Sequence, residues 1–572
     1  MVDLSELSFF LIVQRSHVNY ADDQKIWTPY IDRQYEGIPI IHVRPFEHDA
    51  SMMDCIKLKD FTKFRIRLKE RNYSMMKSTK NNIWYVCQRN IINEKIYEYM
   101  LRTKAYIEIE NLNLSNRREK VQQLLTTIVN DIEILLKTLC EHELITSFQY
   151  HQMNYRHSSV RLDYMLFNPN TCQQEQVVFE PTIISTLSPL MPICRYLHRL
   201  LAPIYYNQVA HLTTVTKGAD LVQRLEYYQQ QGYLQSSTYL ITICIRDPYV
   251  SITHQRLLQT LKCFLDDYVM DETVQGMHTM AILKLTEFLL QHQYFVYQNC
   301  LYRQVTGGGT GLYFMNLLID IYLFYWQQPL LLYQNQHEIV VRCFSDLFLT
   351  WNKSKEKFQW ILDEMKKKHP YIQYDINIQT KHIHYLDVQI HSWYKQTLQT
   401  EVYHDWKYEP YIMPTMYDTS SFSTWNLIQT ALIRAVLCCS QLEDFQHEQQ
   451  YIEYSFLFNR FSFNYVRQSI EEFFIYFKIS DLTIYHDQTT YEELRRYVRQ
   501  YDQENTEKKM KGREEAQKQC FWYIYSSLKG PDLIRAKQNP KQFLPSHLHD
   551  YQHLPGITIE IVGLSDYPCY TS

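Results

Sequence analysis

The sequence predicts a multidomain α+β protein, and three observations lead to that prediction. The chain has 572 residues, more than the ~250–300 residues at which a single hydrophobic core usually stops growing. Its hydrophobic content is 45% and its charged content 21%, as in packed globular chains rather than disordered ones. In the middle of the chain, strand-like and helix-like hydrophobic patterns alternate, and mostly helical patterns flank them.

Charge and cysteine usage narrow the class of function and the compartment. The net charge is −4, so the whole chain lacks the basic balance typical of nucleic-acid-binding proteins. Thirteen cysteines lie scattered without CxxC pairs, which favours reduced thiols in an intracellular, nuclear or cytoplasmic protein over a disulfide framework or a zinc site. The apolar run Phe9–Val13 is too short for a signal peptide, and no run reaches the ~18 residues of a membrane span, so we expect no membrane partner.

The N-terminal part combines an irregular start with a basic segment. Three prolines, Pro29, Pro39 and Pro45, predict irregular structure there. Residues 57–80 then hold nine Lys or Arg against two acidic residues, so this segment is the best candidate for contact with phosphate. A solvated helix face is an equally good interpretation. The possible phosphate contacts are Lys57, Lys59, Lys63, Arg65, Arg67, Lys69 and Arg71.

The elements that follow are predicted from hydrophobic period. Dense apolar and aromatic residues predict strands over 81–88 and 238–245, and helical spacing predicts helices over 118–145, 189–207, 254–269 and 279–295. Next come a glycine-rich loop and an apolar helix, a hairpin over 337–351 with its turn at 345–346, a helix ended by Pro370, and a strand over 382–391. The pattern is helical over 425–477, an exposed helix or linker is expected over 504–519, and a short strand over 556–563.

The glycine-rich loop precedes the most apolar helix of the chain. Four of the twelve glycines stand within five positions, at Gly307, Gly308, Gly309 and Gly311. Glycine tolerates positive φ and lets the backbone approach a ligand closely, and the N-terminus of the following helix would present N–H groups to an anion. Alone, such a loop is a weak motif, and a tight structural turn explains it more often.

Its neighbours change that balance, because together they resemble the motifs of reverse transcriptases in the form found in Penelope-like retroelements. Segment 302–322 resembles motif B, with Tyr302, Gln304, Gly307, Gly311 and Asp320-Ile321-Tyr322 in the family's spacing. Segment 242–254 resembles motif A, 342–351 resembles motif C, and 180–197 resembles the fingers motif. Segment 385–390 resembles the strand beyond motif C. The motifs stand in family order over roughly residues 70–480, and telomerase catalytic subunits are more distant relatives of this group.

The resemblance implies a right-hand polymerase-like fold with extra helical N- and C-terminal regions. It implies an N-terminal extension at 1–70, a fingers-like region at 71–235 and a palm-like region with an antiparallel sheet at 236–410. A helical thumb-like region at 411–480 and a C-terminal extension at 481–572 would follow. The implied activity is RNA-directed DNA polymerisation, with Mg²⁺ as the cofactor if the protein is active and no cofactor otherwise.

The departures from the family pattern concern the metal ligands. Two-metal polymerases need carboxylate oxygens for Mg²⁺. The resemblance places the motif A aspartate at Cys244 and the two motif C aspartates at Ser345 and Asp346, so one of three carboxylates remains. Asp247 is a poor substitute, because side chains alternate along a strand and an odd offset points to the opposite face unless the chain turns first.

Positions expected to meet phosphate are altered as well. Glu180 stands where the family's fingers motif has an arginine, and His404 and Asp405 replace basic residues, with Lys407 close by. These changes remove positive charge from the surface that would contact nucleotide. In segment 382–391, His382 and His384 share a strand face and are either metal ligands or, more commonly, polar residues of an edge strand; we expect no metal site.

Three hypotheses follow. The first is a reverse-transcriptase-like protein that no longer polymerises and binds RNA or DNA weakly. The second is an active RNA-directed DNA polymerase that uses Asp346 with an unrecognised carboxylate. The third is a helical protein-interaction scaffold whose motif matches are accidental, with its protein partner unknown.

Overall fold

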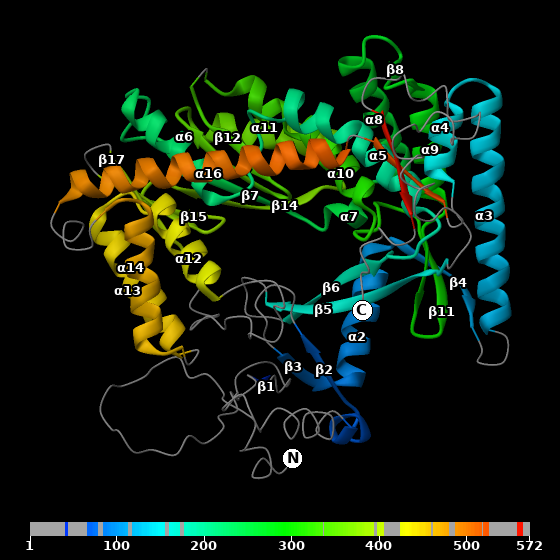
Figure 1. Cartoon of the computed structure of the whole chain (residues 1–572), viewed down its shortest axis with the longest axis horizontal. Helices are drawn as coiled ribbons and strands as arrows, with labels where there is room; N and C mark the ends of the chain where they lie inside the picture. Colours follow the sequence, from blue (N-terminus) through cyan, green and yellow to red (C-terminus); the bar gives the residue numbers. More distant parts are fainter. Residues whose placement is uncertain are drawn as a thin grey trace. The chain divides into compact units, whose positions relative to one another are not determined.

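The computed structural model describes residues 41–43, 66–77, 84–112, 117–154, 160–171, 177–335, 337–393, 397–404, 424–458, 461–479, 487–517, 519–525 and 557–563 (Figure 1). The chain forms two compact units, Met1–Ile470 and Glu471–Ser572. In the described part of the chain, no helix is both long enough and apolar enough to cross a membrane.

A four-stranded antiparallel sheet lies at the centre of the first unit. Its strand order is β12-β13-β7-β14, formed by Val340–Cys343, Asp346–Trp351, Tyr239–Arg246 and Gln373–Gln379. Strand β7 alternates between buried isoleucines on one face and more exposed residues on the other, as a sheet with one covered face requires. One face of the sheet is therefore apolar, and the other is exposed at the end that holds Cys244 and Arg246, whereas Leu240, Phe348 and Thr350 are buried on it.

The apolar face of this sheet packs into the main core, which several helices build. Ile241, Ile243, Ile245, Leu347 and Leu349 are all buried in one cluster with residues of these helices. The helices are α3 (Arg117–Glu141), α4 (Ser147–Met153), α5 (Met191–Pro203), α8 (His254–Tyr268), α9 (Thr279–Gln291), α10 (Tyr313–Tyr333) and α11 (Lys355–Lys368). Burial of this many apolar side chains, at ~25 cal/mol per Å², dominates the stability of the unit.

The first unit contains a second, five-stranded sheet, which was not predicted from the sequence. Its order is β4-β11-β10-β5-β6, formed by Tyr106–Asn111, Cys300–Gln304, Tyr294–Tyr297, Asp163–Thr171 and Val177–Ile184. Helix α2 (Arg89–Thr103) packs Ile92, Ile96 and Tyr99 against Met165, Phe167, Phe179 and Phe295 of this sheet. The strands come from distant parts of the chain, so no local pattern announced the sheet.

Smaller elements complete the first unit. Strands β1 (Ile41–Val43), β3 (Trp84–Gln88) and β2 (Tyr73–Lys77) form one antiparallel sheet, and β8 (Thr273–Val274) and β9 (Met277–His278) form a short hairpin. A π-helix, η2 (Ile204–Val209), continues α5, and α7 (Pro248–Ser251) follows β7. Strands β15 (His382–Tyr385), β16 (Val388–Trp393) and β17 (Thr397–Val402) pack against α6 (Gly218–Gln230), α12 (Thr424–Cys438) and α13 (Leu442–Phe458).

The second unit contains the end of α14 (Phe463–Tyr476) and the 30-residue helix α16 (Gln488–Gln517). The two segments are in contact where the ring of Tyr501 meets those of Tyr476 and Phe477. Strands β18 (Gln519–Tyr525) and β19 (Ile557–Gly563) pair in parallel. The charged segment 504–519 is thus helical as far as Gln517, and 556–563 contains the predicted strand.

Three predictions of local structure were wrong in detail. The helix predicted over 279–295 ends at Gln291, and Tyr294 and Phe295 begin strand β10. The 337–351 segment is a hairpin, but its turn is Phe344-Ser345, and Asp346 already begins β13 opposite Cys343. Phe344 adopts the left-handed conformation that this tight turn demands. Segment 382–391 is not one strand but two, β15 and β16, joined at Leu386-Asp387 with Leu386 at positive φ. The turn at 344–345 was placed one residue too late, and the turn at 386–387 was missed because neither of its residues is Gly, Pro or Asn.

Candidate active site

The positions of the three expected carboxylates lie together at one end of the central sheet. Cys244 of β7 is the direct cross-strand partner of Asp346 of β13, so the two side chains share the open face. Ser345 is in the hairpin turn just before Asp346, and its carbonyl accepts a hydrogen bond from the Ile245 N–H at 2.9 Å. Cys244 is exposed and Asp346 half-buried. The structure thus brings together the three positions at which the resemblance places the catalytic aspartates.

A second carboxylate, Asp375, lies in line with Asp346 and Cys244 across the strands, and sequence reasoning missed it. We call Asp346, Ser345, Cys244 and Asp375 the metal-ligand row. Asp375 of β14 is the cross-strand partner of Cys244 on its other side. Because neighbouring strands are ~4.8 Å apart, the backbones of Asp346 and Asp375 are about 10 Å apart with Cys244 between them. Arg246 donates hydrogen bonds to both Asp375 carboxylate oxygens, the one from Nε at 2.6 Å. These bonds raise the pKa of Arg246, so Asp375 is neutralised by a permanent cation.

Asp247 does not supply the missing ligand. It lies just beyond β7 in the left-handed conformation, with φ 46°, and points toward helix α2. There Arg102 Nη2 is 3.3 Å from its carboxylate, and Tyr99 Oη is 3.5 Å away. Burial raises the pKa of Asp247, the Arg102 guanidinium opposes that rise, and the charge of Glu180 adds to it. Asp247 therefore joins the end of β7 to α2 instead of facing Asp346.

The glycine-rich loop packs on the segment that follows β7. A Cβ on Gly307 would lie 1.8 Å from the Tyr249 carbonyl oxygen, and Gly307 has φ +71°. A Cβ on Gly311 would lie 2.1 Å from the Ile183 carbonyl oxygen. Glycine is required at both positions because another backbone passes so closely. The close approach expected toward a ligand is therefore made toward the protein's own chain.

Hydrogen bonds hold this loop to motif A. The N–H groups of Gly307 and Gly308 donate to the Ile252 and Tyr249 carbonyls at 2.6 and 2.9 Å, and the Gly309 N–H donates to Gln293 Oε1 at 2.6 Å. Three amides that a phosphate would need are thus engaged within the protein. These loop amides are therefore occupied, and the anion contact expected at the N-terminus of α10 stays a prediction.

Two further motif residues hold the loop from inside. Gln304 is buried, and its amide donates to the Tyr249 and Thr306 carbonyls at 3.0 and 2.9 Å. His254, the histidine of the motif A pattern, makes a hydrogen bond to the Gly307 backbone. Burial lowers the pKa of His254 to about 4, so its ring is neutral near pH 7. Motifs A and B are therefore connected through side chains that the resemblance had matched.

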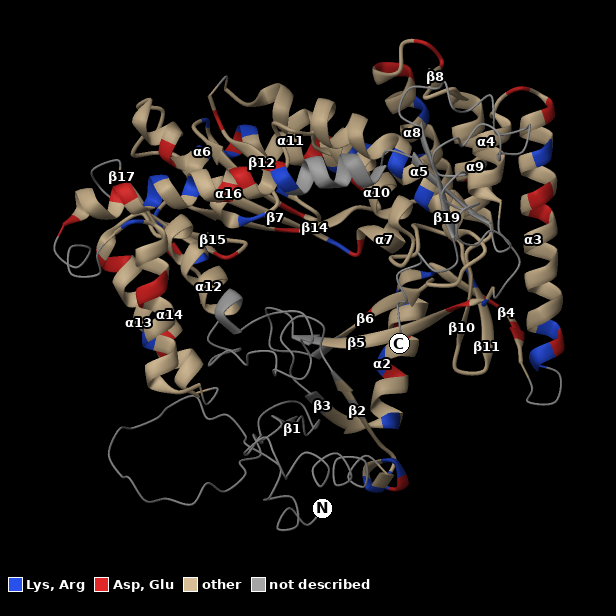
Figure 2. Cartoon of the chain, viewed as in Figure 1, with Lys and Arg blue, Asp and Glu red and all other residues tan. Residues whose placement is uncertain are grey.

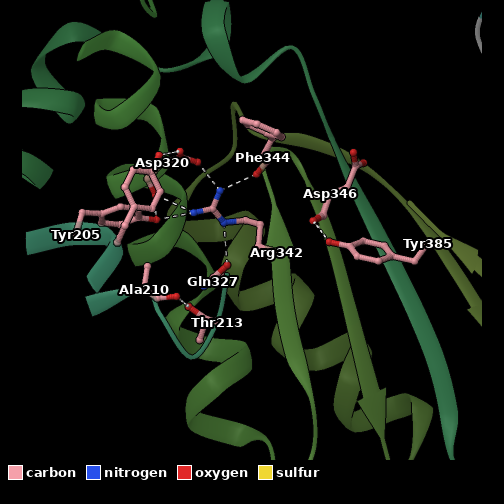
Figure 3. A network of polar contacts seen from close by, with 10 residues as sticks. Tyr205, Ala210, Thr213, Asp320, Gln327, Arg342, Phe344, Asp346 and Tyr385 are labelled. Carbon is pink, nitrogen blue, oxygen red and sulfur yellow. Dashed lines mark hydrogen bonds and ion pairs between the residues drawn. The ribbon is translucent and has the colours of Figure 1, made fainter. Parts of the chain in front are cut away.

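Motifs B and C are connected by a buried cation (Figure 3). Arg342 of β12 is 2% exposed, and its guanidinium forms an ion pair with Asp320 of α10 at 2.7 Å. It also donates to Gln327 Oε1, to the Phe344 carbonyl and to the Tyr205 hydroxyl, at 3.1, 2.6 and 2.7 Å. We call these residues, with Tyr206, which donates to Asp320 at 2.9 Å, the Arg342 cluster.

The Arg342 cluster satisfies a charge that would otherwise be costly to bury. Desolvation alone would lower the pKa of Arg342, but the partners outweigh it and raise that pKa. A buried guanidinium with a full set of acceptors fixes a unique geometry. Asp320 and Arg342 belong to segments that resemble motifs B and C, but the sequence did not predict that the two residues pair. No sequence pattern pointed to Tyr205 or Tyr206.

Most of the positions predicted to contact phosphate lie outside the described residues. Lys57, Lys59, Lys63, Arg65, Asp405 and Lys407 lie outside the described residues. Arg67, Lys69 and Arg71 are exposed on a short helical segment and the turn after it. Over the described elements, Figure 2 shows Lys and Arg interspersed with Asp and Glu. Glu180 is on β6, and His404 lies 2.5 Å from the buried carboxylate of Glu448.

The residues present do not suit a pair of magnesium ions. Within the described ranges, no group of three His, Cys, Asp or Glu side chains is placed to hold a metal ion. Mg²⁺ requires hard oxygen ligands, yet the centre of the row is a thiol, and Asp375 is held by Arg246. His382 and His384 are exposed on β15, the edge strand of its sheet, and His384 stacks on Tyr403 with ring centroids 4.3 Å apart.

The topology defines the class of fold: α+β, with a right-hand polymerase-like arrangement of an antiparallel palm sheet and a helical region after it. Telomerase from Candida albicans in complex with a TWJ fragment of telomeric RNA is 10% identical, with a TM-score of 0.48 over 79% of this chain and 75% of that one. Apo telomerase from Candida tropicalis is 10% identical, with a TM-score of 0.41 over 79% and 77%. The RNA-dependent RNA polymerase of a human picobirnavirus is 9% identical, with a TM-score of 0.38 over 70% and 79%. Neither a protein-family profile nor a curated protein matches the sequence.

Proposed function

We propose that this chain is a reverse-transcriptase-like protein, derived from a Penelope-like retroelement, that does not polymerise nucleotides. The observation that carries the proposal is the pairing of Asp346 with Cys244 at the end of the central sheet. Two-metal catalysis needs carboxylates that converge on ions ~3.5–4 Å apart. Here one carboxylate faces a thiol, whose softness favours zinc or copper over magnesium.

A primer-extension assay tests the loss of activity. Purified protein, a primed RNA template, dNTPs and Mg²⁺ or Mn²⁺ are expected to give no extension above a no-enzyme control. The variant Cys244→Asp/Ser345→Asp restores both altered ligands, and we expect extension to stay poor because Glu180 and Asp405 still oppose phosphate. Template-dependent extension by the unaltered protein would overturn the proposal. Robust extension by the double variant alone would show that only the metal ligands were lost.

The alternative of an active polymerase has one specific observation in its favour. Asp375 stands on the same face as Asp346, in register across Cys244, and is the unrecognised carboxylate that this alternative requires. Its pairing with Arg246 and the backbone separation of about 10 Å argue against a shared ion pair. If extension is observed, Asp346→Asn and Asp375→Asn should each abolish it; an effect of the first alone would exclude Asp375 as a ligand.

The residual function in this proposal is weak binding of RNA or DNA, led by the basic segment 57–80. Such binding should fall steeply as salt rises, because phosphate contacts release counterions. We expect Arg67→Glu/Lys69→Glu/Arg71→Glu to weaken binding of a single-stranded oligonucleotide about tenfold at low salt. The matched control is Lys366→Glu/Lys367→Glu/Lys368→Glu, which reverses three exposed charges at the end of α11. Equal losses in both variants would refute the assignment to this segment.

A further inference from the structure

The surface where α10 ends and α11 begins exposes large apolar side chains. Leu332 is 75% exposed, Trp360 43% and Tyr333 39%. The rings of Tyr333 and Trp360 touch edge to face, with centroids 5.3 Å apart. Single exposed apolar residues need no explanation, but a contiguous group marks an interaction surface. We call these three residues, with Lys353, Lys355 and Lys357 beside them, the α10–α11 patch.

The three lysines of the patch are held on aromatic rings. Lys357 Nζ is 3.9 Å from the centroid of Trp360 and 4.9 Å from that of Tyr333. Lys355 Nζ is 5.0 Å from the ring of Tyr239, and Lys353 donates to the Tyr333 carbonyl. Among the described residues, no carboxylate forms an ion pair with these three ammonium groups. The patch is therefore a fixed concentration of positive charge in a chain whose net charge is −4.

Lys355 and Lys357 stand in the first turn of α11, on either side of Glu356. Lys355 is its first residue, and Ser354 is its N-cap, whose hydroxyl accepts the Lys357 N–H at 3.3 Å. Cations at a helix N-terminus oppose the helix dipole. Glu at the position of Lys357 would complete a Ser-x-x-Glu capping box. A sequence that departs from local preference at an exposed site indicates a use other than folding.

We propose that the α10–α11 patch binds an acidic segment of a partner protein that carries at least one apolar side chain. Carboxylates of that segment pair with the three lysines, and its apolar side chain packs beside Leu332. Single-stranded nucleic acid fits the patch less well, because bases bind by stacking on aromatic faces. Lys357 already covers one face of Tyr333 and one of Trp360.

The test uses fluorescence anisotropy with the full chain and a labelled peptide of sequence DDLEDLFDDLEE. We expect binding that Lys355→Glu/Lys357→Glu weakens by about tenfold or more and that Leu332→Ser weakens by a smaller factor. The double variant completes the capping box, so its thermal midpoint should rise, which separates lost binding from lost folding. The control Lys366→Glu/Lys367→Glu/Lys368→Glu should bind as the unaltered chain does.

Three outcomes would overturn the proposal. The first is no binding of the peptide at millimolar concentration. The second is equal binding of a peptide with every acid replaced by its amide, because the lysines would then play no part. The third is tighter binding of oligo(dT) than of the peptide, with the same loss in the double variant, which would assign the patch to nucleic acid.

Discussion

The Arg342 cluster and the metal-ligand row flank the same two-residue turn, yet they differ in burial and in the contacts of their side chains. Arg342, which is buried, and Asp320, which is half-buried, match the motif pattern and are joined by an ion pair at 2.7 Å. Cys244 and Ser345, which depart from it, are exposed and half-buried respectively. Asp346 also matches the pattern, and its backbone carbonyl accepts a hydrogen bond from the Tyr385 hydroxyl at 2.8 Å.

The difference separates a buried network on which folding depends from more exposed positions on which it depends little. Removing one partner of a buried ion pair costs ~3–5 kcal/mol, so the Arg342 cluster contributes to stability whether or not the protein polymerises. A half-buried carboxylate outside such a network, as at Asp346, contributes little to folding. The same motif C therefore contains a residue that folding requires and a position that folding leaves open. The predictions below test that comparison.

The largest effect is expected at the glycine loop that joins motifs A and B. Gly307→Ala should lower the free energy of unfolding by more than about 4 kcal/mol, because its Cβ would meet the Tyr249 carbonyl oxygen at 1.8 Å and φ is +71°. Gly232→Ala is the matched control, with φ +72° and no atom within 4 Å, and should cost only about 1 kcal/mol. Urea unfolding of both variants measures the difference; similar losses would mean that the contact with Tyr249 is unimportant.

Arg342→Met should cost ~3–5 kcal/mol, because it leaves the Asp320 carboxylate without its cation in a buried site. Arg246→Met also removes an arginine from an ion pair, but the side chains of Arg246 and Asp375 are 53% and 48% exposed. We expect that variant to lose less than about 1 kcal/mol. Denaturant midpoints compare the two, and equal losses would contradict the distinction between the two regions.

Asp163 offers a contrast with Asp320, since it is a buried carboxylate without a cation. Ser185 donates to it at 2.6 Å, and burial raises its pKa from 3.8 to about 6. Between these pH values the folded state binds more protons than the unfolded chain, so stability falls as pH rises through that window. Asp163→Asn should therefore raise the free energy of unfolding by about 1–3 kcal/mol above pH 6.

Below the unfolded pKa the advantage of Asp163→Asn should disappear, because both states of the unaltered chain are then protonated. Thermal unfolding of the two proteins at pH 7.5 and pH 3.5 measures this. A gain of the same size at both pH values would show that packing, not charge, is responsible.

The smallest effect is expected at the metal-ligand row. Asp346→Asn should change the free energy of unfolding by less than ~0.5 kcal/mol, as at other sites outside a buried network. Because we infer no ion site there, millimolar Mg²⁺ or Mn²⁺ should not shift the thermal midpoint of either protein. A metal-dependent rise that the variant abolishes would indicate a bound ion and remove the contrast with the Arg342 cluster.

Much of the fold could be predicted from local pattern. Helices α3, α8 and α11 and strand β7 lie where the period of their apolar residues predicted them, because burial of one face imposes that period. The five-stranded sheet was missed because β5 and β10 pair across more than a hundred residues. The turn in 382–391 was missed because its residues have no Gly, Pro or Asn to mark it.

For this protein, the sequence by itself determined which chemical groups occupy the motif positions: a thiol at Cys244, a hydroxyl at Ser345, a carboxylate at Asp346 and glycines at 307 and 311. Only the tertiary structure decided their neighbours. It placed Asp375 beside Cys244, turned Asp247 toward Arg102 and buried Arg342 against Asp320. The physical reason is that periodicity and composition act along the chain, whereas electrostatic partners are chosen by strand register and packing between residues far apart in it.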